Sequence, residues 1–107
     1  MKMNSCKDIS DAYGLFFGTL ANESRLKILN ILRTGQKNVT EICNATNFEQ
    51  SMVSHNLKLL EYHGMVFLER KGKYRYYRLN KKTIAPLIDL IDAHMKAYCC
   101  KILRGER

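Results

Sequence analysis

The chain has 107 residues, a formal net charge of +8 and four cysteines. This length fits one small domain over 1–107, and the longest apolar run, residues 12–21, is interrupted by two glycines and a threonine and is too short to span a membrane. The cysteines lack the spacing of a disulfide framework and residues 1–8 contain no apolar signal segment, so we expect reduced thiols and a cytoplasmic protein.

The positive charge is concentrated in residues 50–82. This third of the chain holds eight lysines and arginines against two glutamates, so that +6 of the +8 lies there. A concentrated basic stretch favours binding to phosphate polymers, since each neutralised phosphate releases counterions. The expected partner is therefore a nucleic acid rather than a membrane.

Three helices are predicted in the first part of the chain. Apolar residues recur at helical spacing over 9–20, and a second helix is expected over 23–34 after Asn22, which can cap it. Asn38 and Glu41 have the spacing of a capping box, so a short third helix should start there.

The fourth predicted helix, 50–62, has two different faces. Val53, Leu57 and Leu60 recur at the spacing of a buried stripe. The opposite face carries polar or amphipathic side chains, namely Ser51, Ser54, His55, Lys58 and Tyr62. One face can pack in the core while the other remains available to contact bases.

After residue 64 the apolar period changes to two, which predicts a two-stranded hairpin. Gly72 lies where the strands would turn, and the surrounding segment 70–78 holds five cations and no acid. On the second strand, Tyr77 and Leu79 share one face and are expected to pack inward, whereas Tyr74 and Tyr76 share the other.

The last segment returns to helical spacing and carries a heptad-like stripe. Its members are Ile84, Ile88, Ile91, Met95, Tyr98 and Ile102. Alternating steps of four and three residues are typical of a helix that pairs with another helix. The stripe would otherwise face water, so we expect a dimer.

This order of elements is mostly α-helical with one small β-hairpin, and it predicts a winged helix-turn-helix with the order helix, helix, helix, helix, hairpin, helix. The segments 20–29, 53–60, 64–66 and 70–79, taken in this order and at these spacings, resemble the ArsR/SmtB family of bacterial and archaeal repressors. The resemblance implies a homodimer joined by its first and last helices, which places Phe16 at the interface with the C-terminal stripe. It also implies a repressor released from operator DNA by a metal ion, metalloid or redox signal.

The recognition helix of such a fold contacts base edges, and flanking elements contact phosphates. The candidate contacts on the helix are Gln50, Ser51, Ser54, His55 and Lys58, and those on the hairpin are Arg70, Lys71, Lys73 and Arg75. Glu49 departs from the family pattern, because many members have a small hydroxyl residue there, and its charge would repel phosphates. We expect no enzyme activity, because Ser54 and His55 are helix neighbours that point about 100° apart.

One other class of function remains open. The chain can be an interaction module that binds RNA or non-specific DNA without an inducer, and Tyr74 and Tyr76 among the hairpin cations would suit single strands. A winged helix that binds only protein is disfavoured by the clustered charge.

The candidate sensing residues are Cys99 and Cys100, with Cys6 in the N-terminal arm that the family architecture places beside the last helix. Three thiolates would suit As(III) or a heavy-metal ion as inducer, since soft ligands select soft metals. Oxidation or persulfide formation, and simple packing against a partner chain, remain alternatives. Cys43 is expected to be a small core residue, and His94 alone is an insufficient metal site.

Overall fold

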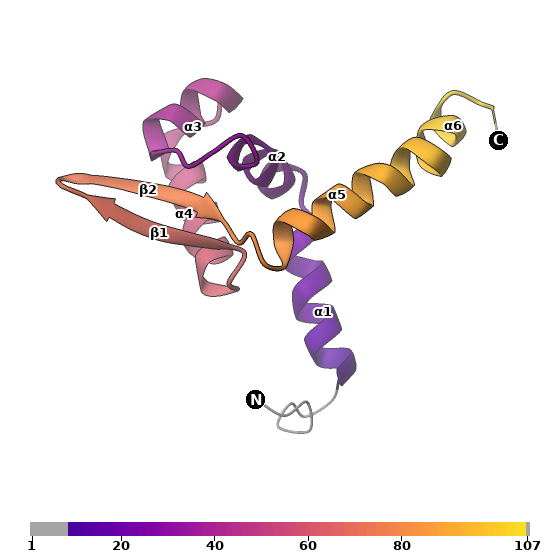
Figure 1. Ribbon diagram of the computed structural model, residues 1–107, viewed down its shortest axis with the longest axis horizontal. Coiled ribbons are helices and arrows are strands. Elements are labelled where there is room, and N and C mark those ends of the chain that lie inside the picture. The colour runs from indigo at the N-terminus through magenta and orange to yellow at the C-terminus, as the bar shows by residue number, and fades with distance from the viewer. Residues whose placement is uncertain (1–8, 107) are drawn as a thin grey trace.

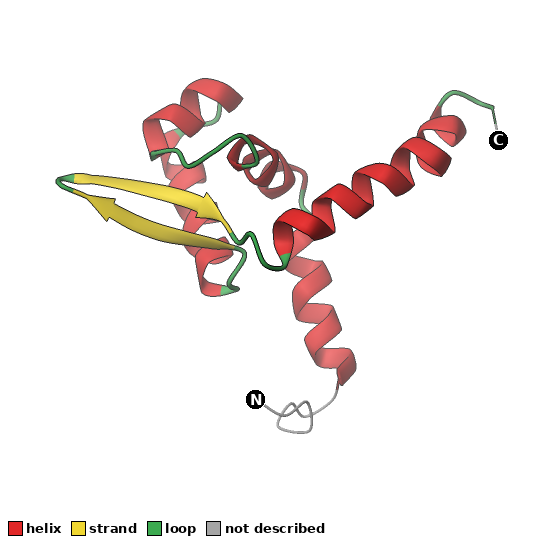
Figure 2. Ribbon diagram, viewed as in Figure 1, coloured by secondary structure: helices red, strands yellow, loops and turns green. Residues whose placement is uncertain are grey.

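The structure is a computed structural model that describes residues 9–106. Its elements follow the predicted order (Figures 1 and 2). They are α1 (Ile9–Leu20), α2 (Glu23–Leu32), α3 (Val39–Thr46), α4 (Gln50–Tyr62), β1 (Val66–Lys71), β2 (Tyr74–Leu79), α5 (Ile84–His94), a π-helical turn (Met95–Cys99) and α6 (Cys100–Leu103). The predicted winged helix-turn-helix with flanking helices is confirmed.

Asparagines define the start of α2 and both ends of α3. Asn22 Oδ1 accepts from the amide of Arg25 at 3.0 Å and caps α2. Asn38 and Glu41 form the predicted capping box at the start of α3, with bonds of 2.8 and 2.9 Å. Asn47 ends that helix with a φ of 61°, a left-handed conformation that asparagine tolerates better than most residues.

Helix α2 ends at Leu32, two residues earlier than the sequence predicted. The amides of Arg33, Thr34 and Gly35 bond to carbonyls three residues back instead of four, so the chain tightens into a turn. The Thr34 hydroxyl also donates to the carbonyl of Ile31 at 2.9 Å, which supports this earlier end.

The core lies between α2, α3, α4, the hairpin and the start of α5. Val53, Leu57 and Leu60 of α4 have no exposed surface, as their spacing predicted. The inward packing of Tyr77 and Leu79 is confirmed, with exposed fractions of 7% and 4%. Other buried members are Leu20 at the end of α1, Ile28, Leu29, Leu32, Ile42, Met65, Val66, Ile84 and Ile88.

Helix α1 and the C-terminal helix project from this body in different directions, with the hairpin tip on the far side (Figure 1). Both helices expose large apolar side chains, which are Ile9, Tyr13, Leu15 and Phe17 on α1 and Leu90, Met95, Tyr98, Ile102 and Leu103 on the C-terminal helix. None of the helices within residues 9–106 has the length and apolar character needed to cross a bilayer.

Two expectations about the C-terminal stripe are wrong. Ile84 and Ile88 do not face water in the single chain, because they pack in its own core. The heptad is also interrupted, since the amide of Cys100 bonds to the carbonyl of Met95, five residues back. This π-turn adds one residue to the helical turn and rotates the following residues by about 100° relative to an uninterrupted α-helix.

Candidate nucleic-acid interface

The polar face of α4 is open to solvent. Gln50, Ser51, His55 and Lys58 are exposed, while Ser54 is half-buried. Because the opposite stripe of this helix is fully buried, the rotation of α4 about its axis is fixed by the core. The five predicted contact residues therefore share one surface, which we call the reading face.

The start of α4 has an unusual cap. Glu49 has the extended backbone of an N-cap residue, with φ −69° and ψ 148°, and its carbonyl accepts from the amide of Val53 at 3.0 Å. Its side chain makes no cap hydrogen bond. The carboxylate therefore does not take the place of the capping hydroxyl, and it adds negative charge beside the reading face.

Asn56, in the middle of α4, was not selected from the sequence. It is 7% exposed, and its amide nitrogen donates to the carbonyl of Met52 at 3.0 Å. Its Oδ1 accepts from Nη1 of Arg25 at 3.4 Å, across 31 positions of sequence. In the sequence, the only local sign that Asn56 is buried is its place beside Leu57 of the buried stripe. No local pattern predicts that its hydrogen-bond partner is Arg25.

The hairpin forms the wing of the fold. Its strands pair antiparallel from Val66 opposite Leu79 to Lys71 opposite Tyr74, and Gly72 takes the φ of 62° that the turn requires. The predicted contacts Arg70, Lys71, Lys73 and Arg75 are all exposed. Arg70 and Arg75 lie directly opposite each other, so like charges are adjacent on one surface that would be stabilised by an anionic partner.

The base of the wing is fixed to the body. Lys37, in the loop before α3, exchanges two backbone hydrogen bonds with Tyr77, at 3.0 and 2.8 Å. The backbone hydrogen bonds to Lys37 therefore tie the base of the wing to the loop before α3.

Burial raises the pKa of Tyr77 above its usual value of 10.0. The negative charge of Glu61 raises this pKa further, whereas the positive charge of Arg75 lowers it.

Cations and aromatic rings alternate along the wing. Lys71 Nζ lies 5.8 Å from the ring centre of Tyr76, and the guanidinium carbon of Arg78 lies 4.9 Å from that of Phe67. These contacts cover part of the aromatic surface, although Tyr74 remains 54% exposed. The wing thus presents mainly positive charge.

The predicted thiols lie at the far end of the C-terminal helix. Cys99 ends the π-turn, Cys100 begins α6, and both are half-buried. Cys6 lies outside the described residues. Within residues 9–106 no group of three His, Cys, Asp or Glu side chains could hold a metal ion, so the two thiols do not form a site by themselves. Cys43 packs against the core, as expected.

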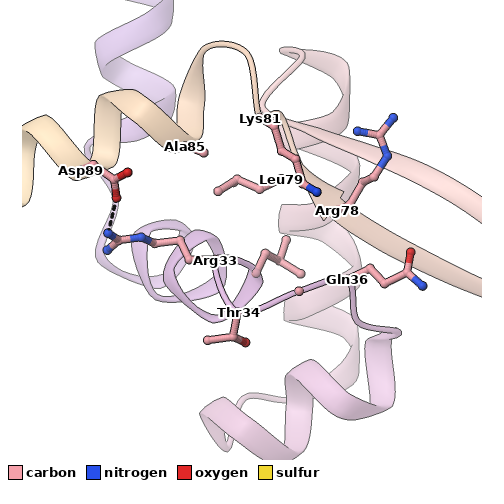
Figure 3. A pocket seen from close by; sticks show the side chains of 10 residues that line it. Arg33, Thr34, Gln36, Arg78, Leu79, Lys81, Ala85 and Asp89 are labelled. Atoms are coloured by element: carbon pink, nitrogen blue, oxygen red, sulfur yellow. Dashed lines mark hydrogen bonds and ion pairs between the residues drawn. The ribbon is translucent and has the colours of Figure 1, made fainter.

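A pocket of about 540 Å³ lies between the end of α2, the end of β2 and the start of α5 (Figure 3). On its α5 side, Arg33 donates to Asp89 and to Asp92, each at 2.6 Å. These two carboxylates raise the pKa of the guanidinium further above its ordinary value. The link joins α2 to the C-terminal helix, and the pocket contains none of the predicted contact residues.

Comparisons with known proteins agree with this geometry. The family model described as bacterial regulatory protein, arsR family, matches residues 22–66. The chain is 43% identical over 70 residues to the transcriptional regulator NmtR of Mycobacterium tuberculosis, an alignment that covers 65% of this chain and 58% of that protein. It is 34% identical over 86 residues to the arsenical resistance operon repressor of Escherichia coli, covering 79% of this chain and 71% of the relative.

Among solved structures, the homodimeric winged helix-turn-helix DNA-binding domain from Mycobacterium bovis superposes with a TM-score of 0.78 at 31% identity. This superposition covers 85% of the chain and 84% of that domain. Some relatives are longer, since the chain spans 58% of NmtR and 65% of an SmtB repressor from M. tuberculosis. The relatives that match over most of their length decide the assignment: the chain belongs to the arsR family of bacterial regulatory proteins.

Proposed function

We propose that this protein is a transcriptional repressor that binds a specific operator in double-stranded DNA as a homodimer. The observation that carries this proposal is the reading face of α4, which is exposed, polar and fixed by a buried opposite stripe, next to a wing rich in exposed cations. A helix of this kind fits the major groove, and the wing cations fit the adjacent backbone or minor groove.

Several relatives support the proposal by their names. The regulators from M. tuberculosis and E. coli are described as transcriptional regulators or repressors, and the similar domain from M. bovis is a homodimer. A dimer would place two reading faces on two half-sites about one helical turn apart.

The decisive experiment is selection of bound fragments from genomic DNA, followed by affinity measurements at one salt concentration. A specific operator should bind at least about 10³-fold more tightly than a random duplex of the same length. Equal affinity for both duplexes, or tighter binding to single strands or RNA, would instead support the non-specific interaction module.

We further propose that a soft metal or metalloid ion, or oxidation of the same thiols, releases the repressor through Cys99 and Cys100 together with Cys6. The described part of the chain supplies two of these thiols on adjacent positions of one helix. Thiolates would hold As(III) or a heavy-metal ion and exclude hard cations. The E. coli relative is named for arsenical resistance, which makes arsenite the first ion to test.

A further inference from the structure

The side chain of Arg25 joins three helices. Its Nε donates to the carbonyl of Thr19 at 2.7 Å and its Nη2 to that of Gly18 at 3.4 Å, both in the last turn of α1. Its Nη1 donates to Oδ1 of Asn56, in the middle of α4. Arg25 itself lies in the first turn of α2, so one guanidinium connects the end of α1, the start of α2 and the centre of the recognition helix.

The end of α1 suits a cation. The last carbonyls of a helix have no partner within it and carry the negative end of its dipole. No ion pair found among residues 9–106 includes Arg25. The two carbonyls of Gly18 and Thr19 therefore supply the negative charge that an acid supplies elsewhere. This fork of donors adds a polar contact to the apolar packing of Phe16 and Leu20, which also holds α1 against the core.

The other end of the link is equally constrained. Asn56 is almost fully buried, and its amide nitrogen is occupied by the carbonyl of Met52. Its oxygen is thereby directed at Arg25, and a buried amide is costly to leave unpaired. Asn56 directly follows His55 on the chain, so the link to Arg25 ends in the same turn of α4 as the reading face.

We propose that Arg25 and Asn56 are positioning residues, which fix the orientation of α4 relative to α1 and so determine how well an operator is distinguished from other duplexes. This inference rests on the proposed DNA-binding function. Because α1 also exposes the apolar side chains Tyr13 and Phe17, the same link makes the reading face respond to whatever packs against α1.

The first test compares Arg25→Lys with Arg33→Lys. Both variants keep the charge and lose a two-pronged donor, Arg25 in the first turn of α2 and Arg33 directly after its last turn. The side chain of Arg33 donates hydrogen bonds to α2 and α5 residues and, within the described part of the chain, not to α1 or α4. For each variant, the affinities for the selected operator and for a random duplex are measured at one salt concentration, together with the Tm. Arg25→Lys should reduce the ratio of the two affinities by about tenfold, and Arg33→Lys should leave it within about twofold even where both lower the Tm.

The second test asks whether the two residues act as one unit. If they do, Asn56→Ala should reduce the same ratio of operator affinity to random-duplex affinity. In the double variant, this ratio should be no more than about twofold below that of the single variant with the lower ratio. In the free protein, the backbone amide NMR signals of residues 52–58 should move in Arg25→Lys and remain in place in Arg33→Lys.

An unchanged affinity ratio with unchanged α4 signals in Arg25→Lys, or losses that multiply in the double variant, would overturn the proposal. If the wild type shows no preference for any operator, the proposed function fails instead. The amide signals of the free protein then still decide whether Arg25 positions α4.

Discussion

His55 and Lys58 lie on the exposed side of α4 within one turn of each other, while Leu57 between them has no exposed surface. This alternation places the proposed base-contacting residues and core residues next to each other in sequence. A substitution on the reading face can therefore change DNA affinity without opening the core, and the two effects are separable by experiment.

Replacing His55 or Lys58 by Ala is expected to lower operator affinity by about 1–3 kcal/mol each, because in the proposed complex each variant removes a side chain that would contact the groove. Fluorescence anisotropy at fixed salt with operator and random duplexes measures the difference. The Tm should change little, since both residues are exposed. Equal losses on the two duplexes would contradict base contact by these residues.

Tyr77 provides a prediction about pH. Its folded-state pKa is raised above 10.0 by burial and by Glu61, so folding favours the neutral phenol. The stability that this phenol contributes is complete below about pH 10 and is lost as the pH rises through the folded-state pKa. Urea unfolding at increasing alkaline pH should show a decline that is shallower in Tyr77→Phe. Tyr74→Phe is the control, because Tyr74 is exposed, and it should decline as steeply as the wild type.

Residues that act through local spacing were predictable. The buried stripe of α4 and the inward tyrosine of the wing follow from periods of three to four and of two. The contact of Arg25 with Asn56 was not predictable, because it joins residues 31 positions apart and leaves no periodic pattern in either segment. An arginine in the first turn of a helix, such as Arg25, can equally well lie exposed to solvent, so its sequence position alone does not predict a link to α4.

At the scale of elements, the wing separates into an anchored base and a charged tip. The base exchanges backbone hydrogen bonds with the loop before α3, whereas the tip residues around Gly72 are exposed. The contribution of the tip to DNA affinity should therefore depend on its charge, whereas the position of the wing depends on the contacts of its base with the body.

Changing Lys71 and Lys73 together to Ala should weaken binding to all duplexes alike. Each phosphate contact contributes about 0.9 to the slope of log affinity against log salt, so the slope should fall by about one to two units. Titrations at four salt concentrations with operator and random DNA give this slope. A loss confined to the operator would instead indicate that the wing reads sequence.

Element boundaries were predictable where caps define them. Helix α4 begins and ends where the pattern of faces predicted, and the capping box at Asn38 starts α3 as expected. The early end of α2 and the π-turn at 95–99 were missed, because both depend on which carbonyl an amide selects and not on the order of side chains.

At the scale of the whole molecule, the heptad pattern could not distinguish contacts within the chain from contacts between chains. Ile84 and Ile88 pack in the chain's own core, and the exposed apolar residues of α5 begin at Leu90, which is 69% exposed and was not selected from the sequence. Phe16 and Ile91 are half-buried against the core, so they are less suitable probes of a dimer than Leu90.

Leu90→Asp is expected to convert a dimer into a monomer while the body remains folded, because the carboxylate is solvated in the protomer and would be buried unpaired in the dimer. Sedimentation velocity measures the oligomeric state. Ile88→Ala is the contrasting variant, which should lower the free energy of unfolding by about 2–5 kcal/mol through a core cavity. An unchanged dimer for Leu90→Asp would place the interface elsewhere.

The joint variant Cys99→Ser with Cys100→Ser should bind the operator as the wild type does but resist release by arsenite or cadmium. The ion can act only through a higher affinity for the DNA-weak state, and a coupling of about 1–3 kcal/mol is typical. Titration of the operator complex with each ion measures the release of the protein from DNA. A parallel titration with a persulfide donor in metal-free buffer tests the redox alternative. Cys43→Ala, a core position, should retain release. Full release of the serine variant would exclude these thiols as the sensor.

The two projecting helices have one further consequence. Within the protomer, α1 and the distal C-terminal helix cover little of each other's apolar surface, so in the proposed dimer much of their burial would come from association. By mass action, folding of these helices is then linked to protein abundance. The thermal midpoint should rise with protein concentration, and a cell holding few copies would contain a chain whose body is folded while its terminal helices are frayed.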